Sequence, residues 1–254
     1  MRADLHEALS ARLLAMADDE LILGHRDSEW CGHAPILEED IAFANLALDE
    51  LGHAIIWYQL YAELIGRDPE TLPDELAYQR PAADFQNVRI VELPKGDWAF
   101  TLVRQYLFDV YEAVMLEKMA ESQYDLLAGA AAKIRKEEIY HQRHTSAWVR
   151  RLGLGTEESH QRMQIALDSL WPEALSLFQP LPNDEVLAEA WIVPRLADAQ
   201  AAWEGQVRPW LTDAGLTVPG DVHAAGKRGQ HSKHLAQILD DLQEVTRLFP
   251  DNQW

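Results

Sequence analysis

The chain of 254 residues contains a single cysteine, Cys31. This scarcity excludes an internal disulfide framework and any zinc or iron–sulfur site that needs several thiolates. No apolar run approaches the ~20 residues that a membrane-spanning helix requires. The first residues, Met1 to Glu7, carry charges of both signs and lack the apolar segment of a secretion signal. We therefore expect a cytoplasmic protein.

Basic residues are also scarce, since 22 Lys and Arg stand against 42 Asp and Glu and give a formal net charge of -20. Such an acidic surface repels phosphate backbones and anionic lipid head groups, which argues against nucleic acid and membrane surfaces as partners. A solvated acidic surface accounts for most of these carboxylates, but some could hold cations. Hydrophobic residues make up 48% of the chain, enough to bury a sizeable core.

The apolar residues recur with the period of α-helices, and the alternation typical of strands is nearly absent. Long helices are expected at residues 4–29 and about 38–66, and again at about 97–122 and 125–152, each pair joined by a short turn. Residues 67–96 hold four prolines and predict a long, irregular crossover. Two hairpins joined by one long crossover are typical of an all-α, ferritin-like helical bundle.

Further helices are expected after the bundle, and no repeat, low-complexity segment or flexible linker separates them from it. We therefore predict a single domain over residues 1–254, with the core bundle at about 4–152 and C-terminal helices at about 156–250 packed on it. The additional helices are expected at residues 157–178, 186–212 and 231–248.

Two Glu-x-x-His pairs lie in the second and fourth predicted helices. They are Glu50 with His53, and Glu138 with His141. Residues three positions apart share one face of a helix, so the two side chains of each pair can ligate the same metal ion. A pair of this kind is weak evidence alone, because chance also produces it. We interpret a third match, Glu157 with His160, as such a coincidence.

The spacing across each hairpin strengthens the prediction. Glu20 lies thirty residues before Glu50, and Asp109 lies twenty-nine residues before Glu138. In an antiparallel hairpin these separations place each lone carboxylate level with the Glu-x-x-His pair of the neighbouring helix, on an otherwise apolar stripe. Buried carboxylates are unfavourable unless they are paired, protonated or coordinated to a metal.

The sequence therefore predicts a site for two metal ions, with Glu50 and Glu138 as bridging ligands. Carboxylate-rich sites with one imidazole per metal suit iron, with manganese as a substitute. Glu112 competes with Asp109, and Glu137 and His144 are expected to support the ligands from outside. The predicted metal ligands are Glu20, Glu50, His53, Asp109, Glu138 and His141.

The one concentrated basic segment of this acidic chain spans residues 226–234. Its lysine, arginine and histidine side chains suggest three alternatives: a contact with a phosphorylated ligand, a contact with an acidic partner subunit, or a solvated helix start.

Several segments resemble the C subunits of bacterial phenylacetyl-CoA 1,2-epoxidase. The resemblance extends over nearly the whole chain and is most specific in the turn Glu29-Trp30-Cys31-Gly32-His33-Ala34-Pro35. It includes Glu38 with the helix to Leu64, Arg104-Gln105-Tyr106, Ala120-Glu121-Ser122, residues 226–235 and the terminal Gln253-Trp254.

This resemblance implies a ferritin-like subunit of a multicomponent monooxygenase that epoxidises phenylacetyl-CoA in aerobic phenylacetate breakdown. The implied partners are a homologous catalytic subunit, at which the acyl-CoA substrate would bind, and a reductase that carries NADPH, flavin and iron–sulfur groups. In that family the di-iron centre belongs to the A-type chain, and the C-type chain is regarded as a structural partner without metal ligands. The present chain departs from this pattern, because all six predicted ligands are in place.

Three functional hypotheses follow. The chain is a C-type subunit of the complex that still carries a metal site, or it is itself a di-iron oxygenase or oxidase, or it is a metal-free ferritin-like scaffold. We favour the first for its role in the cell.

Overall fold

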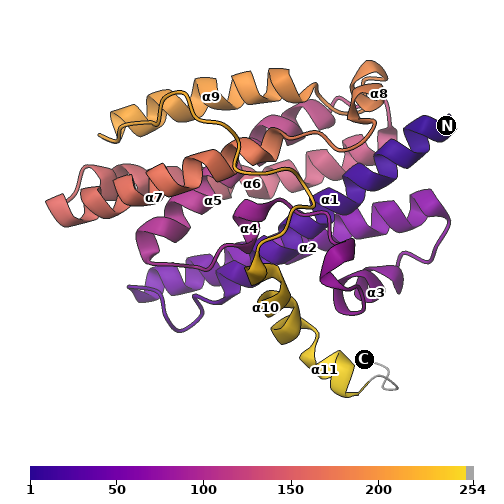
Figure 1. Cartoon of the computed structure of the whole chain (residues 1–254), viewed down its shortest axis with the longest axis horizontal. Coiled ribbons are helices and arrows are strands. Elements are labelled where there is room, and N and C mark those ends of the chain that lie inside the picture. Colours follow the sequence, from indigo (N-terminus) through magenta and orange to yellow (C-terminus); the bar gives the residue numbers. More distant parts are fainter. Residues whose placement is uncertain (250–254) are drawn as a thin grey trace.

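The computed structural model describes residues 1–249, and within this range the chain is helical and forms no strand. The bundle consists of α1 (Ala3–Ser28), α2 (Leu37–Ile65), α5 (Trp98–Met119) and α6 (Asp125–Gly153), which confirms the predicted all-α, ferritin-like architecture (Figure 1). Gln253 and Trp254, part of the family resemblance, lie outside the described residues.

Local sequence signals set the ends of the bundle helices. Gly66 ends α2 in the left-handed conformation, with a φ of 73°, which glycine adopts without steric strain. Asp97 caps α5 by accepting a hydrogen bond from the Phe100 backbone N–H. The turn between α1 and α2 is fixed to α5, because the buried Trp30 donates from Nε1 to Thr101 Oγ1 at 2.9 Å.

The crossover is more regular than the sequence predicts. It contains α3 (Leu72–Tyr78), a 3₁₀ turn (Ala82–Asp84) and α4 (Arg89–Glu92). The expectation of an irregular segment was wrong because Pro73 lies in the first turn of α3. Backbone N–H groups of a first turn have no partner within the helix, so a proline, which lacks this group, is tolerated there.

Two neighbouring carboxylates of α1 hold the crossover against the bundle. The Gln86 backbone N–H donates to Asp18 Oδ2 at 2.7 Å, and the Val88 N–H donates to Asp19 Oδ1 at 2.7 Å. The crossover is thereby anchored directly beside Glu20, the first of the predicted ligands.

Within the described residues, five α-helices follow the bundle: α7 (Glu157–Leu175), α8 (Asp184–Glu189), α9 (Leu196–Asp213), α10 (Lys233–Leu242) and α11 (Glu244–Leu248). The single helix predicted at 186–212 was wrong, because Trp191 has a φ of 57° and Pro194 cannot join a continuing helix. The helix predicted at 231–248 begins at Lys233, where Ser232 caps it, and is interrupted at Gln243.

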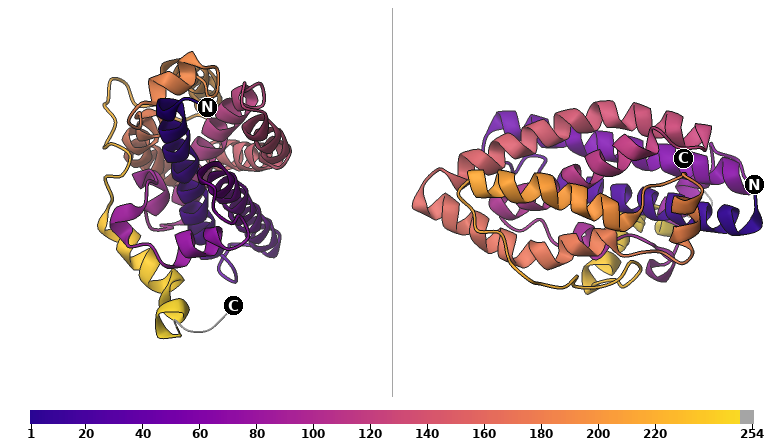
Figure 2. Two further views of the ribbon diagram at one scale, coloured as in Figure 1. Left: turned by 90° about the vertical axis from the view of Figure 1, so that its right-hand side faces the viewer. Right: turned by 90° about the horizontal axis from the view of Figure 1, so that it is seen from above.

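Helices α7, α8 and α9 pack on the bundle, whereas α10 contacts α4 and the 3₁₀ turn of the crossover (Figure 2). Both α7 and α9 contact α5, while α8 contacts α1. Trp203 of α9 is fully buried and donates from Nε1 to the Leu107 carbonyl at 3.0 Å. One hydrophobic cluster runs from α1 through to α10. Among residues 1–249, none of the helices combines the length and apolar character needed to cross a bilayer.

Gly24 allows α1 and α2 to approach closely at the level of the predicted ligands. A Cβ at this position would lie 3.0 Å from Glu50 Cβ and 3.1 Å from the Ala47 carbonyl oxygen. Such distances are tighter than ordinary packing, so a larger side chain would force the two helices apart.

We predict that Gly24→Val lowers the free energy of unfolding by about 1–3 kcal/mol, because it overpacks the α1–α2 interface. Gly52→Ala is the matched control, since a Cβ there meets nothing within 4 Å and alanine favours the helix by about 1 kcal/mol. Urea unfolding of the two variants measures the difference. Equal stabilities would show that Gly24 does not set the helix separation.

Candidate metal centre

The four bundle helices bring the two Glu-x-x-His pairs together in the core. Glu20 of α1 joins Glu50 and His53 of α2 in one group, and Glu50 joins Glu138 and His141 of α6 in a second. Within each group one ligand atom per residue lies within 4.8 Å of the others. All of these side chains are buried, so the predicted convergence of α1, α2 and α6 carboxylates and imidazoles is present.

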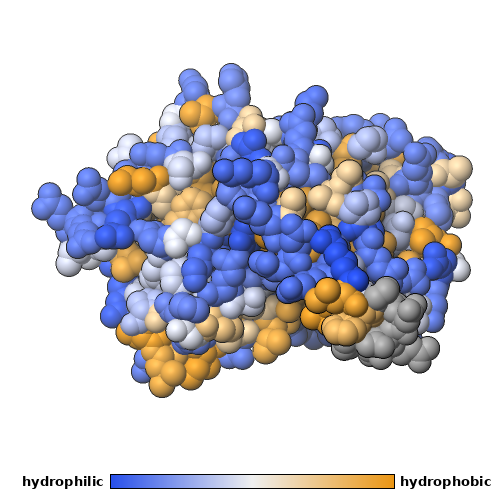
Figure 3. All heavy atoms as spheres, turned by 60° about the horizontal axis from the view of Figure 1, so that its bottom comes forward, coloured by the Kyte–Doolittle hydropathy of each residue, from blue (hydrophilic) through white to orange (hydrophobic). Residues whose placement is uncertain are grey.

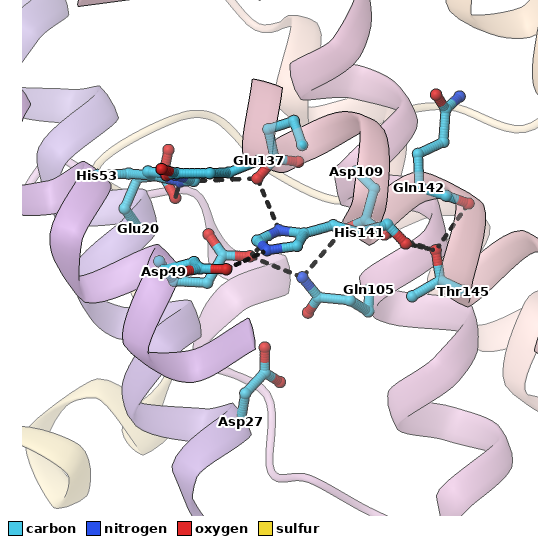
Figure 4. Close-up of polar contacts among 12 residues, drawn as sticks. Glu20, Asp27, Asp49, His53, Gln105, Asp109, Glu137, His141, Gln142 and Thr145 are labelled. Carbon is cyan, nitrogen blue, oxygen red and sulfur yellow. Dashed lines mark hydrogen bonds and ion pairs between the residues drawn. The ribbon is translucent and has the colours of Figure 1, made fainter. Parts of the chain in front are cut away.

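The two imidazoles point toward each other, with ring centroids 6.0 Å apart (Figure 4). Each ring is held on its outer side by a carboxylate, with 2.8 Å from His53 Nε2 to Glu137 Oε2 and 3.1 Å from His141 Nε2 to Asp49 Oδ2. The inner Nδ1 atoms lie 3.6 Å (His53) and 2.7 Å (His141) from Glu138 Oε1. An outer carboxylate fixes the tautomer and orientation of an imidazole that offers its other nitrogen to a metal.

The inward-facing atoms of this cluster lack hydrogen-bond partners among the described residues. A buried polar atom without a partner costs about 1–3 kcal/mol, and charged groups cost more. A cation at the centre of the cluster would satisfy these atoms together, so the donor set fits a metal. The atoms are Glu20 Oε2, Glu50 Oε2, both carboxylate oxygens of Glu138, and Nδ1 of His53 and His141.

The carboxylates of α5 differ in their surroundings. Asp109 accepts hydrogen bonds from Gln105 Nε2 at 2.9 Å and from Thr145 Oγ1 at 2.5 Å, and it lies outside the two three-residue groups. Glu112 is also buried, and its Oε2 has no partner among the described residues. The structure therefore places both residues in the core and leaves the choice of α5 ligand open.

The shifted pKa values of the cluster reflect the crowding of negative groups. Burial raises the pKa of Glu20 well above its usual range, and the charge of Glu50 raises it further. Burial likewise raises the pKa of Glu112, with Glu138 adding to the effect. Burial alone would lower the pKa of His141, but the charge of Glu138 and the hydrogen bond with Asp49 raise it to about 12. Without a metal, the cluster must retain protons to stay stable.

The chain matches the family described as "Phenylacetic acid catabolic protein" over residues 1–254. The chain belongs to this family. It is 39% identical to the C subunit of 1,2-phenylacetyl-CoA epoxidase from Escherichia coli, an alignment that covers 97% of this chain and 99% of that protein. It is 26% identical to the A subunit of the same enzyme, over 85% of this chain and 70% of that protein. These similarities confirm the resemblance drawn from the sequence.

Two residues with supporting roles were not predicted from the sequence. Asp49 lies one position before Glu50, just as Glu137 lies one position before Glu138, so the position that selected Glu137 could also have identified Asp49. Gln105 donates from Nε2 to Glu50 Oε1 at 2.8 Å as well as to Asp109. Because Gln105 lies four residues before Asp109, helical spacing could have identified it.

Other histidines singled out in the sequence lie elsewhere. His144 Nε2 contacts Glu39 Oε2 at 2.9 Å and takes no part in the two groups, although it remains close to α2. His160 Nδ1 contacts the Gly153 carbonyl at 2.8 Å, and Glu157 is exposed. The third Glu-x-x-His match is therefore separate from the cluster.

A small cavity of about 20 Å³ adjoins Glu20 and Glu112. Apolar side chains line most of it, including Met16, Trp57 and Met115. This volume holds a water-sized molecule, whereas an apolar cavity that takes up benzene is about 150 Å³.

The basic segment is used largely within the fold. Arg228 is buried, and its Nη1 lies 2.7 Å from Asp19 Oδ2. His231 Nδ1 contacts Glu92 Oε1 at 2.6 Å. The segment thus pins the C-terminal part of the chain to α1 and α4, an internal role that none of the three alternatives anticipated.

We predict that Arg228→Met lowers the free energy of unfolding by about 3–5 kcal/mol, since it leaves the Asp19 carboxylate buried without its cation. Adding Asp19→Asn should recover a large part of this loss, because no unpaired charge then remains. Lys227→Met, at an exposed neighbour, is the control. Denaturant unfolding measures all three, and an Arg228→Met variant as stable as the Lys227 control would refute the internal role.

Proposed function

We propose that the chain is the C-type subunit of a phenylacetyl-CoA epoxidase complex and pairs with a homologous A-type subunit. The observation that carries this proposal is the 39% identity to the Escherichia coli C-type chain over almost the full length of both proteins. The weaker similarity to the A-type chain supports a complex assembled from two related ferritin-like chains. The acyl-CoA substrate would bind at the partner, and electrons from NADPH would arrive through a reductase with flavin and iron–sulfur groups.

We further propose that this subunit itself binds two iron ions, or manganese in their place. The proposed ligands are Glu20, Glu50, His53, Asp109, Glu138 and His141, with Glu112 as the alternative to Asp109. The unpartnered inward atoms support the proposal, because a chain without metal would bury them at a considerable free-energy cost. This same cost counts against the metal-free scaffold.

The surrounding residues would prepare the site for metal. Glu50 belongs to both three-residue groups, a position suited to a bridging ligand. Asp49 and Glu137 hold the outer nitrogens of the imidazoles, and Gln105 keeps the Glu50 and Asp109 carboxylates side by side. The buried surroundings exclude bulk water from the centre. Bound iron would supply redox chemistry with dioxygen.

An independent di-iron oxygenase is the second candidate, favoured by the complete set of predicted ligands. The sizes of the adjoining cavities argue against an aromatic acyl-CoA as its substrate. The cavity beside Glu20 has about 20 Å³ and the one beside Glu138 about 120 Å³, both smaller than an apolar cavity of about 150 Å³ that takes up benzene. Turnover of phenylacetyl-CoA is therefore better assigned to the partner subunit.

Chain produced in iron-rich medium is expected to contain about two iron atoms. The double variant Glu50→Ala, His141→Ala should fall below about a tenth of an atom, because both groups lose a ligand. His160→Ala is the matched control, since this histidine caps a helix outside the cluster. Metal analysis by mass spectrometry measures the content. Iron below a tenth of an atom in the unmodified chain would refute the metal proposal.

Asp49→Asn should weaken metal binding about 10–100-fold, because His141 loses the carboxylate that orients it. Glu63→Gln, an exposed position on the same helix, should leave the affinity unchanged. Titration of the apo-protein with Co²⁺, followed by visible absorption, gives the affinities. Equal affinities would show that Asp49 does not support a ligand.

Reconstitution tests the role in the complex. The chain mixed with an A-type subunit and the reductase is expected to oxidise phenylacetyl-CoA, whereas the chain with the reductase alone should not. Turnover that persists with the Glu50→Ala, His141→Ala variant would assign the catalytic centre to the partner. Turnover without any A-type subunit would instead support the independent oxygenase.

A further inference from the structure

One side of the bundle has no second layer of helices among the described residues. The segments after α6 cover α1 and α5, because α8 packs on α1 while α7 and α9 pack on α5. The principal contacts of α2 are with α1, α3 and α6. In the end-on view (Figure 2, left), α2 and α6 form the right-hand side of the molecule, away from α10, although α6 also contacts α7 and α9.

The outer face of α2 presents large apolar side chains to solvent. Leu37 is 72% exposed, Ile41 56%, Leu48 66% and Ile55 49%. Their spacing of four, seven and seven residues places them on one face of the helix, along about 27 Å of its length. We call these four residues the α2 seam. Figure 3 shows apolar surface gathered along the lower edge of one face of the molecule.

The neighbouring helix α6 carries exposed cations. Lys133, Lys136 and Arg143 are exposed on α6, and none of them forms an ion pair with a carboxylate of residues 1–249. Tyr140 lies among them, 55% exposed and stacked on His144. We call the three cations the α6 strip. Other basic residues, such as Arg135, Arg150 and Lys227, also form no ion pair among residues 1–249, so the strip is distinguished by its position beside the exposed face of α2.

We propose that the α2 seam and the α6 strip together form the surface that docks the A-type subunit. The inference rests on the proposed function and adds the face by which the two chains meet. The chemistry of the surface specifies its partner: an apolar helix flanked by carboxylates would cover the seam and neutralise the strip. An exposed apolar row beside one sign of charge is typical of a protein interface, since the apolar part supplies affinity and the charges orient the encounter.

A second copy of this chain fits the surface less well. A two-fold interface brings the same patch from each copy together, so an antiparallel pairing through α2 would set one α6 strip against the other. The like charges of Lys133, Lys136 and Arg143 would then face one another and repel. The surface therefore favours a partner whose apolar helix is flanked by carboxylates, rather than by lysine and arginine as in this chain.

The test uses the full-length chain and a purified A-type subunit of the same source, with affinity measured by isothermal titration calorimetry. The double variant Ile41→Glu, Leu48→Glu should weaken binding at least about tenfold, a loss typical of buried apolar anchors. Ile165→Glu is its control, because Ile165 is 61% exposed on α7, away from the seam.

A second pair of variants tests the strip. Lys133→Glu, Arg143→Glu should slow association and reduce its salt dependence. Lys227→Glu, Lys233→Glu changes the same charge at two exposed positions outside α6, in the C-terminal segment that contacts the crossover, and should leave association unchanged. Circular dichroism and thermal unfolding of every variant show that the fold is retained.

Unchanged affinity of the seam variant, with the unmodified chain binding normally, would overturn this inference and leave the proposed function standing. A homodimer of the isolated chain that the seam variant dissociates would also overturn it, in favour of a second copy. If the unmodified chain does not bind the A-type subunit at all, both the inference and the proposed function fail.

Discussion

Three consecutive buried carboxylates in α1, Asp18, Asp19 and Glu20, constrain the rest of the structure. Each must be compensated, because an isolated charge in the core is strongly unfavourable. Arg80 of the crossover pairs with Asp18, and Arg228 near the C-terminus pairs with Asp19. Glu20 has no Arg or Lys partner among the described residues; its Oε2 lies 3.8 Å from His53 Nδ1, and it faces the other carboxylates of the core. The fold thus supplies cations for two of the three positions and gathers acidic ligands around the third.

This arrangement explains why the crossover and the C-terminal segment lie where they do. Both cross the bundle at the level of the cluster and neutralise the residues next to Glu20, so the remaining negative charge is concentrated at one place. The same two carboxylates accept backbone N–H groups of the crossover, which ties its path to the site. The crossover and the C-terminal segment therefore neutralise buried negative charge in the core.

The parts of the fold and site that follow local rules could be predicted from the sequence. Helical periodicity gave both hairpins, and the thirty-residue spacing of Glu20 and Glu50 gave the convergence of carboxylates from neighbouring helices. The break at Pro194 also had a signal, which the amphipathic pattern on either side obscured. The pairing of Asp19 with Arg228 had none, because the two residues are 209 positions apart. Nor could spacing show that Thr145 of α6 donates to Asp109 of α5, since that contact depends on how the two helices pack.

The pairing of Asp19 with Arg228 also has a consequence for synthesis of the chain. α1 leaves the ribosome before Arg228, which lies 209 positions after Asp19. During that interval Asp19 lacks its native cation, so the bundle cannot bury this face of α1 in its final form. Completion of the core must therefore wait until Arg228 has been synthesised, although the contacts within each hairpin are local and can form earlier.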